Sequence, residues 1–143
     1  MTSVQEIVDK LELIPHPEGG YYRRTFQNKL GPENRGHATA IYYLLEGGRY
    51  NKWHRFDSDE LWFWHAGATL TLEIAHEKHG VTSKKLGPDI LAEELPQLLA
   101  PAGDWQRAKS NGNWTLVSCS VSPGFTFNSY ELIDDPNWHP NNQ

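Results

Sequence analysis

A histidine and a glutamate six residues apart are the pair in this sequence best suited to acid–base or metal chemistry. Side-chain alternation in the strand expected over residues 50–56 places His54 and Phe56 on one face. The acidic turn 57–59 then leads into a second strand, so Glu60 can face the same interior. An imidazole beside a carboxylate can bind a metal or act as a general base with its orienting partner. We therefore predict His54 and Glu60 as catalytic residues, with Glu60 orienting the His54 base.

Aromatic side chains are the second group of candidates, because six Trp and six Tyr are many for a chain of 143 residues. Such rings form the walls of small-molecule pockets, and core packing or a subunit interface is their alternative use. Alternation from Glu60 puts Trp62 and Trp64 on its face and makes them ligand-binding candidates, whereas Trp53 next to His54 points the other way. The candidate proton donors opposite His54 are three tyrosines: Tyr43, Tyr50 and Tyr130.

A polar segment near the N-terminus has two readings. His16 and Glu18, together with Arg23 and Arg24, would suit an anionic group such as a phosphate or carboxylate, and Arg23 is retained as a ligand-binding candidate. A loop followed by a solvated strand edge explains the same residues. Cys119 lies between two serines in an expected strand, which predicts a small core residue.

Composition excludes several classes of partner. Thirteen basic and eighteen acidic residues give a net charge of −5, which is unsuited to nucleic acid. No apolar run is long enough to span a membrane, and residues 1–6 lack the basic and apolar regions of a secretory signal. With a single cysteine, no internal disulfide can form. We therefore expect a cytoplasmic protein that contacts neither nucleic acid nor membrane.

The elements that position these residues are mainly short strands. Ser3 and Glu6 form a capping box for one helix over about residues 3–13, and prolines end it. The Asn-Gly-Asn sequence at 111–113 predicts a tight hairpin. The polar tail 134–143 is expected to be loosely held. Eight or nine strands in one domain, residues 1–143, predict an all-β closed barrel or jelly roll over about 20–132. The expected strands are 20–26, 38–45, 50–56, 60–66, 69–74, 81–86, 104–110, 114–121 and 125–132, and the segment 90–99 is read as one short helical turn followed by a strand.

At this point the sequence resembles the cupin superfamily. The first cupin motif is Gly-x5-His-x-His-x3–4-Glu-x6-Gly, and residues 48–67 reproduce its spacing with Phe56 at the second His. The second motif begins Pro-x-Gly-x-x-His, and residues 101–106 reproduce it with Gln106 at the His position. Over residues 10–133 the chain looks like the uncharacterised cupin family five, through the phrases Pro-His-Pro-Glu-Gly-Gly-Tyr-Tyr, Trp-His-Arg, Ser-Asp-Glu and Pro-Gly-Phe. That branch typically has a His where this chain has Phe63.

The resemblance implies a cupin double-stranded β-helix, a homodimer and a small molecule bound inside the barrel. Metal-dependent cupins present three His and one Glu, and here only His54, Glu60 and the weak donor Gln106 remain, so we expect no cofactor. Metal-free cupins resembling deoxysugar epimerases instead use a His base and a Tyr acid. The sequence thus favours a pocket for a sugar-, nucleotide- or acid-like molecule, with epimerase or isomerase chemistry. The ligand-binding candidates are Phe56, Trp62, Trp64, Gln106, Tyr43, Tyr130 and Arg23.

Three alternatives stay open at this point. The same barrel would serve as a non-catalytic binding or sensor module. His54, Glu60 and Gln106 would also be explained as a hydrogen-bonded cluster that only stabilises the barrel. A metal-dependent enzyme with an incomplete ligand set is the third.

Overall fold

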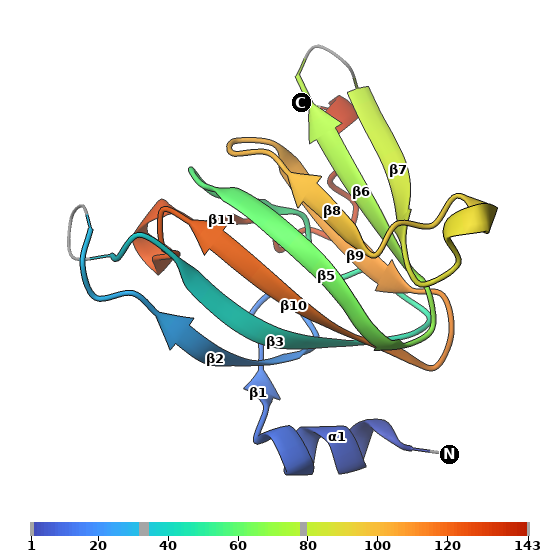
Figure 1. The fold of residues 1–143 in the computed structure, drawn as a ribbon. Helices are drawn as coiled ribbons and strands as arrows, with labels where there is room; N and C mark the ends of the chain where they lie inside the picture. The colour runs from blue at the N-terminus through green and yellow to red at the C-terminus, as the bar shows by residue number, and fades with distance from the viewer. Residues whose placement is uncertain (1, 32–34, 78–79, 143) are drawn as a thin grey trace.

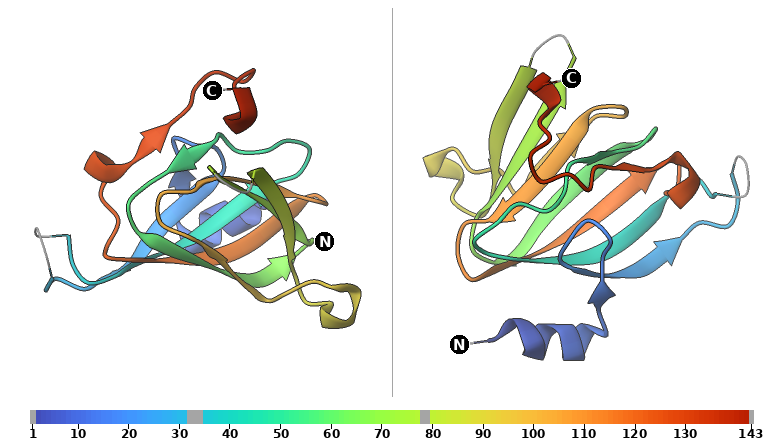
Figure 2. Two further views of the ribbon diagram at one scale, coloured as in Figure 1. Left: turned by 90° about the horizontal axis from the view of Figure 1, so that it is seen from above. Right: turned by 180° about the vertical axis from the view of Figure 1, so that it is seen from behind.

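Two antiparallel β-sheets face each other, and one short helix lies outside them (Figure 1). The computed structural model describes residues 2–31, 35–77 and 80–142. Sheet A has the strand order β1-β2-β3-β10-β5-β8, and sheet B has the order β11-β4-β9-β6-β7. Figure 2 shows the same two layers from above and from behind, with α1 remote from sheet B. The predicted all-β class with a short N-terminal helix is confirmed.

Most strands lie where alternation and turn residues predicted them. The hairpin signal at 111–113 joins β9 to β10, because a tight turn there lets the chain reverse. The predicted turn and strand within 90–99 are a 3₁₀ helix, Ile90–Ala92, followed by β8. The strands are β1 Ile14–Pro15, β2 Tyr21–Gln27, β3 Thr39–Glu46, β4 His54–Arg55, β5 Asp59–Gly67, β6 Leu70–His76, β7 Gly80–Leu86, β8 Gln97–Ala100, β9 Trp105–Ser110, β10 Trp114–Ser122 and β11 Glu131–Leu132.

The helix α1, Val4–Leu11, begins at the predicted capping box. Ser3 accepts from the backbone N–H of Glu6, and the Glu6 carboxylate accepts from the backbone N–H of Ser3. It ends two residues before the predicted boundary because Glu12 adopts a left-handed conformation with φ 56°. Its buried Ile7 packs with Leu13 and Leu44. No helix within residues 2–31, 35–77 and 80–142 is long and apolar enough to cross a membrane.

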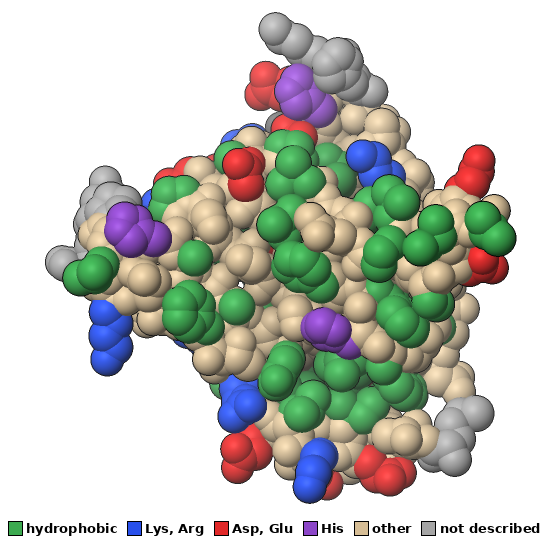
Figure 3. All heavy atoms as spheres, viewed as in Figure 1, with side chains coloured by type: hydrophobic (Ala, Val, Ile, Leu, Met, Phe, Trp, Pro, Cys, Tyr) green, Lys and Arg blue, Asp and Glu red, His purple; other side chains and the backbone are tan. Residues whose placement is uncertain are grey.

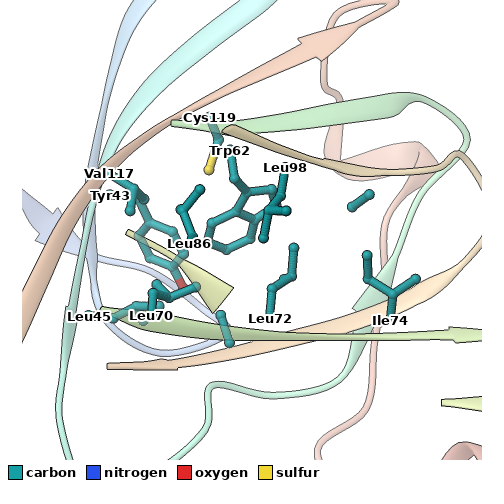
Figure 4. Close-up of a cluster of buried hydrophobic side chains, with 12 residues drawn as sticks. Tyr43, Leu45, Trp62, Leu70, Leu72, Ile74, Leu86, Leu98, Val117 and Cys119 are labelled. Atoms are coloured by element: carbon teal, nitrogen blue, oxygen red, sulfur yellow. The ribbon is translucent and has the colours of Figure 1, made fainter. Parts of the chain in front are cut away.

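The main hydrophobic core fills the space between the two sheets (Figure 4). Trp62 of β5 and Tyr43 of β3 are its largest fully buried side chains, each about 1% exposed. They contact leucines of β6, β7 and β8, so the inward faces of both sheets contribute to one cluster. Cys119 belongs to this cluster, as predicted for a small core residue.

Two predicted strands are mostly loops. Of the strand expected over residues 50–56, only β4 is extended and paired, because the backbone N–H groups of Asn51 and Lys52 donate to Ala108 and Glu18 instead of to a ladder. Of the strand expected over 125–132, only β11 remains. A 3₁₀ turn at Phe127–Ser129 interrupts that segment and bends it. The prediction was wrong for both stretches, because β-rich composition does not show where a backbone finds its partners.

The C-terminal tail is held against sheet B, which corrects the prediction that it is loose. Trp138 packs on Trp105 with ring centroids 4.9 Å apart, and on Trp53 at 6.4 Å. Together with Ile133 these rings form a separate hydrophobic cluster. Burial of a large aromatic ring orders a tail whose polar composition otherwise predicts disorder.

Candidate active site

A cavity of about 510 Å³ opens between the N-terminal loop, sheet A and the segment that precedes β11. Its walls are mainly apolar, and titratable side chains lie among them. Its lining includes charged or polar residues and apolar ones. The first group contains His16, Glu18, Arg23, Arg24, Glu60, Cys119 and Tyr130, and the second contains Tyr22, Ile41, Phe56, Val121, Phe125 and Phe127. A concave apolar space with a few polar groups is the usual form of a small-molecule site.

Glu60, near the start of β5, is a buried carboxylate with one oxygen unused. The Gln106 amide and the Cys119 thiol are near enough to lower its pKa, while its Oε1 has no hydrogen-bond partner among the described residues. Burial raises the pKa of Glu60 to about 7, the neighbouring His54 lowers it, and the Glu18 carboxylate raises it. A carboxyl group that titrates near neutrality can take up or release a proton at physiological pH.

Tyr130 brings a second unpartnered polar atom to the same cavity. Its hydroxyl is buried with no hydrogen-bond partner among the described residues, and its ring lies 5.9 Å from that of His54. Burial, then the Glu18 and Glu60 carboxylates, raise the pKa of Tyr130 far above its ordinary value. The phenol therefore stays neutral and is available as a hydrogen-bond donor.

His54 is oriented by Glu18, which corrects the expected pairing with Glu60. The Nδ1 of His54 lies 2.6 Å from Glu18 Oε2 and 2.8 Å from the backbone oxygen of Lys52. Both neighbours are acceptors, so Nδ1 carries a proton and Nε2 is the nitrogen that titrates. Burial lowers the pKa of His54, but the Glu18 charge and these hydrogen bonds outweigh it and raise the pKa above 6.5.

His16 binds the other oxygen of Glu18. Its Nε2 lies 3.1 Å from Glu18 Oε1, while its Nδ1 accepts from the backbone N–H of Glu18 at 3.2 Å. His16 is therefore the Nε2–H tautomer, which is neutral. Burial lowers the pKa of His16, the Glu18 charge raises it, and His54 lowers it further. Glu18 thus accepts from two imidazoles at once.

The loop that carries these residues turns inward. Tyr43 donates to the Gly19 oxygen at 2.6 Å, and the Lys52 N–H donates to the Glu18 oxygen. Gly20 has φ +75°, and a Cβ there would meet the Leu44 oxygen at 2.6 Å. Sequence reasoning left His16 and Glu18 between an anion site and a solvated loop. The paired glycines that follow Glu18 were the signal that the loop packs closely against a strand.

The structure divides the predicted site residues into two groups. Phe56, Glu60, Tyr130 and Arg23 line the cavity. The predicted catalytic His54 and the remaining ligand-binding candidates lie in the protein interior or at its margin, and none is among the described residues that line this cavity: Tyr43, His54, Trp62, Trp64 and Gln106.

Hydrogen bonds explain why two of the predicted pocket residues serve the interior. Trp62 donates from Nε1 to Gln106 Oε1 at 3.1 Å, which leaves the Gln106 amide to donate to Glu60. Trp64 donates to the Ala68 oxygen. The third tyrosine considered as an acid, Tyr50, instead lies under the Arg107 guanidinium, 4.0 Å from its ring centroid.

Two of the three arginines that line the cavity, Arg23 and Arg24, have weak partners. Arg23 Nη1 lies 3.7 Å from the exposed Glu12 carboxylate. Arg24 donates to the Phe125 oxygen at 3.3 Å, and so ties β2 to the aromatic segment across the cavity. Both remain positioned to meet an anionic group of a ligand.

The donors at the cupin ligand positions do not fit a metal ion. Phe56 offers no donor and Gln106 Oε1 is occupied by Trp62, so Nε2 of His54 and the Glu60 carboxylate are the strong donors left at these positions. Within the part of the chain that the structure describes, no group of three or more His, Cys, Asp or Glu side chains is arranged to hold a metal. Zinc and iron sites need three or more strong donors, so these residues are a poor fit for such a metal.

Comparison with known proteins places this geometry in a family. Residues 5–133 match the family described as Cupin superfamily (DUF985). Protein SO0799 from Shewanella oneidensis has a similar structure, with 37% identity, a TM-score of 0.88, and coverage of 93% of this chain and 85% of that one. A hypothetical protein from Leishmania major gives 28% identity, a TM-score of 0.84, and coverage of 91% and 86%.

Two further relatives mark the range of the similarity. The uncharacterised protein YML079W of Saccharomyces cerevisiae is 25% identical over an aligned length of 153 residues that covers 92% of this chain and 76% of that protein. Oxalate decarboxylase from Bacillus subtilis is 16% identical, with a TM-score of 0.65 over 83% of this chain and 29% of that chain. At that identity the decarboxylase shares the fold alone.

Proposed function

The chain belongs to the Cupin superfamily (DUF985), and we propose that its jelly-roll barrel binds a small polar molecule and moves a proton on it without a metal. The cupin fold itself is the one predicted from the sequence. The proposal rests on one observation: two buried polar atoms without a hydrogen-bond partner in the described part of the chain, Glu60 Oε1 and Tyr130 Oη, belong to residues that line one cavity. Buried polar atoms without partners cost free energy, which a ligand that bonds to them would recover.

The reaction that suits these two groups is proton transfer beside a carbonyl. The Glu60 carboxylate takes a proton from the carbon next to the carbonyl, and the C–H electron pair forms the double bond of an enolate. Tyr130 donates a hydrogen bond to the oxygen on which negative charge develops. Return of the proton from Glu60 to the other face or the neighbouring carbon completes an epimerisation or isomerisation. A carboxyl pKa of about 7 matches this task, since both protonation states are populated near neutral pH.

The proposal gives the proton-carrying role to Glu60, whereas the sequence predicted it for His54. Glu60 lines the cavity, and His54 is held behind it by Glu18 and Lys52. The substrate class that we propose is a sugar-, nucleotide- or acid-like molecule. Its carbonyl would lie at Glu60 and any anionic group toward Arg23 and Arg24, with its ring against Phe56.

Proton exchange measured in D₂O tests the proposal. Native mass spectrometry of freshly purified protein first shows the mass of any retained ligand. A panel of keto sugars, sugar nucleotides and 2-oxo acids is then incubated with the protein in D₂O and followed by NMR. We expect deuterium to enter one C–H position with an apparent pKa near 7.

Two variants make this test specific. Glu60→Gln should abolish exchange, and Tyr130→Phe should slow it by 10²–10³-fold, the usual loss for one donor to a developing oxyanion. Glu46→Gln, an exposed carboxylate at the end of β3, is the matched control and should exchange normally. Binding without exchange at any pH would favour the sensor or binding module instead, and exchange that survives in Glu60→Gln would contradict the proposal.

We also propose the homodimer that the resemblance implies and the cytoplasmic location expected from the sequence. Support for a dimer comes from the outer face of sheet A, where Leu61 and Phe63 are partly exposed and Leu99 is 46% exposed. Figure 3 shows hydrophobic and uncharged side chains across the middle of this face and charged ones mainly around its edge. An apolar centre with a charged rim is typical of an interface. Sedimentation equilibrium should give twice the chain mass, and Leu99→Lys should shift it to the monomer.

A further inference from the structure

A second layer of titratable groups stands behind Glu60, and Glu18 is at its centre. Both Glu18 oxygens are used: Oε1 binds His16 Nε2 at 3.1 Å, and Oε2 binds His54 Nδ1 at 2.6 Å. Asn51 adds a longer contact to Oε2 at 3.4 Å. Glu18 is 6% exposed and His54 is 2% exposed, so water screens this ion pair only weakly.

His54 in turn is linked to Glu60 through the sheet. In the pairing of β4 with β9, His54 lies opposite Gln106, and the Gln106 amide and the His54 charge both lower the pKa of Glu60. A charge on the His54 ring therefore acts on the Glu60 carboxylate across one neighbouring side chain. The loop of residues 16–20 therefore acts on Glu60 in two ways, directly through the Glu18 charge and indirectly through His54.

We propose that Glu18 is a positioning residue for Glu60: it fixes the proton on His54 Nδ1 and holds the His54 imidazole in its cationic form beside the Glu60 carboxylate. The catalytic part of this inference rests on the proposed function of Glu60. The structural part does not: it states that Glu18 sets the tautomer and charge of His54, which lies 36 positions away in the sequence.

Replacing Glu18 changes the pKa of Glu60 through two opposing effects. For Glu60, the pKa-lowering effect of His54 is larger than the pKa-raising effect of Glu18. For His54, burial is the largest single influence and lowers its pKa, and Glu18 is the main opposing group. Replacing Glu18 with neutral glutamine removes a negative charge near Glu60 and also discharges His54. The second consequence is larger, so the Glu60 pKa should rise.

The groups facing His54 come from every neighbouring element, and the test must separate them. They are His16 and Glu18 from the N-terminal loop, Glu60 from β5, Gln106 from β9 and Tyr130 from the segment before β11. Only Glu18 is both charged and directly bonded to His54.

NMR titration of the ligand-free protein tests the inference. Long-range ¹H–¹⁵N spectra of the wild type should show the Nδ1 proton on His54 and the Nε2 proton on His16. In Glu18→Gln the pKa of His54 should fall below 6.5, and ¹³C detection of the Glu60 carboxyl should show its pKa rising above its wild-type value of about 7. Glu73→Gln, which breaks an ion pair with Arg107 at 2.6 Å in sheet B, is the matched control and should leave both unchanged.

Two outcomes would overturn the inference. A fall in the Glu60 pKa in Glu18→Gln would mean that Glu18 acts on Glu60 directly, and no change would mean that it does not act at all. If Glu18→Gln does not fold, His54→Asn keeps a donor for Glu18 but removes the cation, and the same rise at Glu60 is required. Glu18→Asp should restore the His54 tautomer. Absence of substrate turnover would count against the proposed function and leave these titrations unaffected.

Discussion

Replacing Glu60 with glutamine should make this protein more stable at alkaline pH. Glutamine keeps the size of the side chain and an oxygen that can accept from Gln106, but it carries no charge at any pH. The wild-type carboxyl has an ordinary pKa of 4.5 in the unfolded chain and one of about 7 in the fold. Between these values the native state holds a proton that the unfolded state has released, so stability falls as pH rises.

The size of the effect follows from the pKa difference. Each unit is worth about 1.4 kcal/mol, so the wild type carries a penalty of about 3 kcal/mol at pH 8 and less than ~1 kcal/mol at pH 5. Glu60→Gln has no such penalty. Its free energy of unfolding relative to wild type should therefore increase by about 2–3 kcal/mol between pH 5 and pH 8.

Urea unfolding followed by tryptophan fluorescence measures this difference, because buried Trp62 and Trp105 report on both sheets. The midpoint of unfolding should be later for Glu60→Gln than for wild type at pH 8 and nearly the same at pH 5, with equal m-values. Glu46→Gln, at an exposed position, should show no such pH dependence. A Glu60→Gln protein that is less stable than wild type by the same amount at both pH values would refute the reasoning. Its carboxyl would then be ionised and well paired in the fold.

Three more substitutions have expected outcomes. Gly20→Ala should destabilise the fold more than Gly48→Ala does, by at least about 1 kcal/mol in thermal unfolding. Both glycines have positive φ, but of the two only Gly20 lies where a Cβ would meet the backbone, 2.6 Å from the Leu44 oxygen. Arg35→Ala should lower the free energy of unfolding by about 3 kcal/mol and speed amide hydrogen exchange around residue 124. The reason is that the buried guanidinium donates to both Asp57 carboxylate oxygens and to the Gly124 oxygen. An exchange rate equal to that of the wild type would contradict this. Trp138→Ala should release the tail and lower the free energy of unfolding in urea by about 2 kcal/mol, while the Glu60 titration stays unchanged. A changed titration would show that the tail supports the cavity.

Side-chain alternation in the sequence correctly predicted which face of a strand a residue occupies, but it did not predict what surrounds the side chain there. It placed Trp62 on the same side of β5 as Glu60, and both side chains are indeed buried between the sheets. The period of two residues says which side of a strand a residue occupies, but not whether it meets packed leucines or an open cavity. Trp62 meets the leucines, as Figure 4 shows, and Glu60 meets the cavity.

Boundaries were predicted where one local interaction decides them. The capping box of Ser3 and Glu6 fixed the start of α1, and the turn at 111–113 fixed the hairpin of β9 and β10. The segments before His54 and Tyr130 were misread as strands for two different reasons. The N–H groups of residues 51 and 52 donate to distant residues, Ala108 and Glu18, whereas those of residues 129 and 130 donate locally within a 3₁₀ turn.

The sequence alone determined the class of fold and the inward position of Glu60, since residue types and their spacing are sufficient for both. Only the tertiary structure decided that Glu18 rather than Glu60 is bonded to His54, and that Tyr130 shares a cavity with Glu60. The physical reason is that these pairs meet through chain segments far apart in sequence. Burial and electrostatic coupling, which set the chemistry of each group, arise only once those segments are packed together.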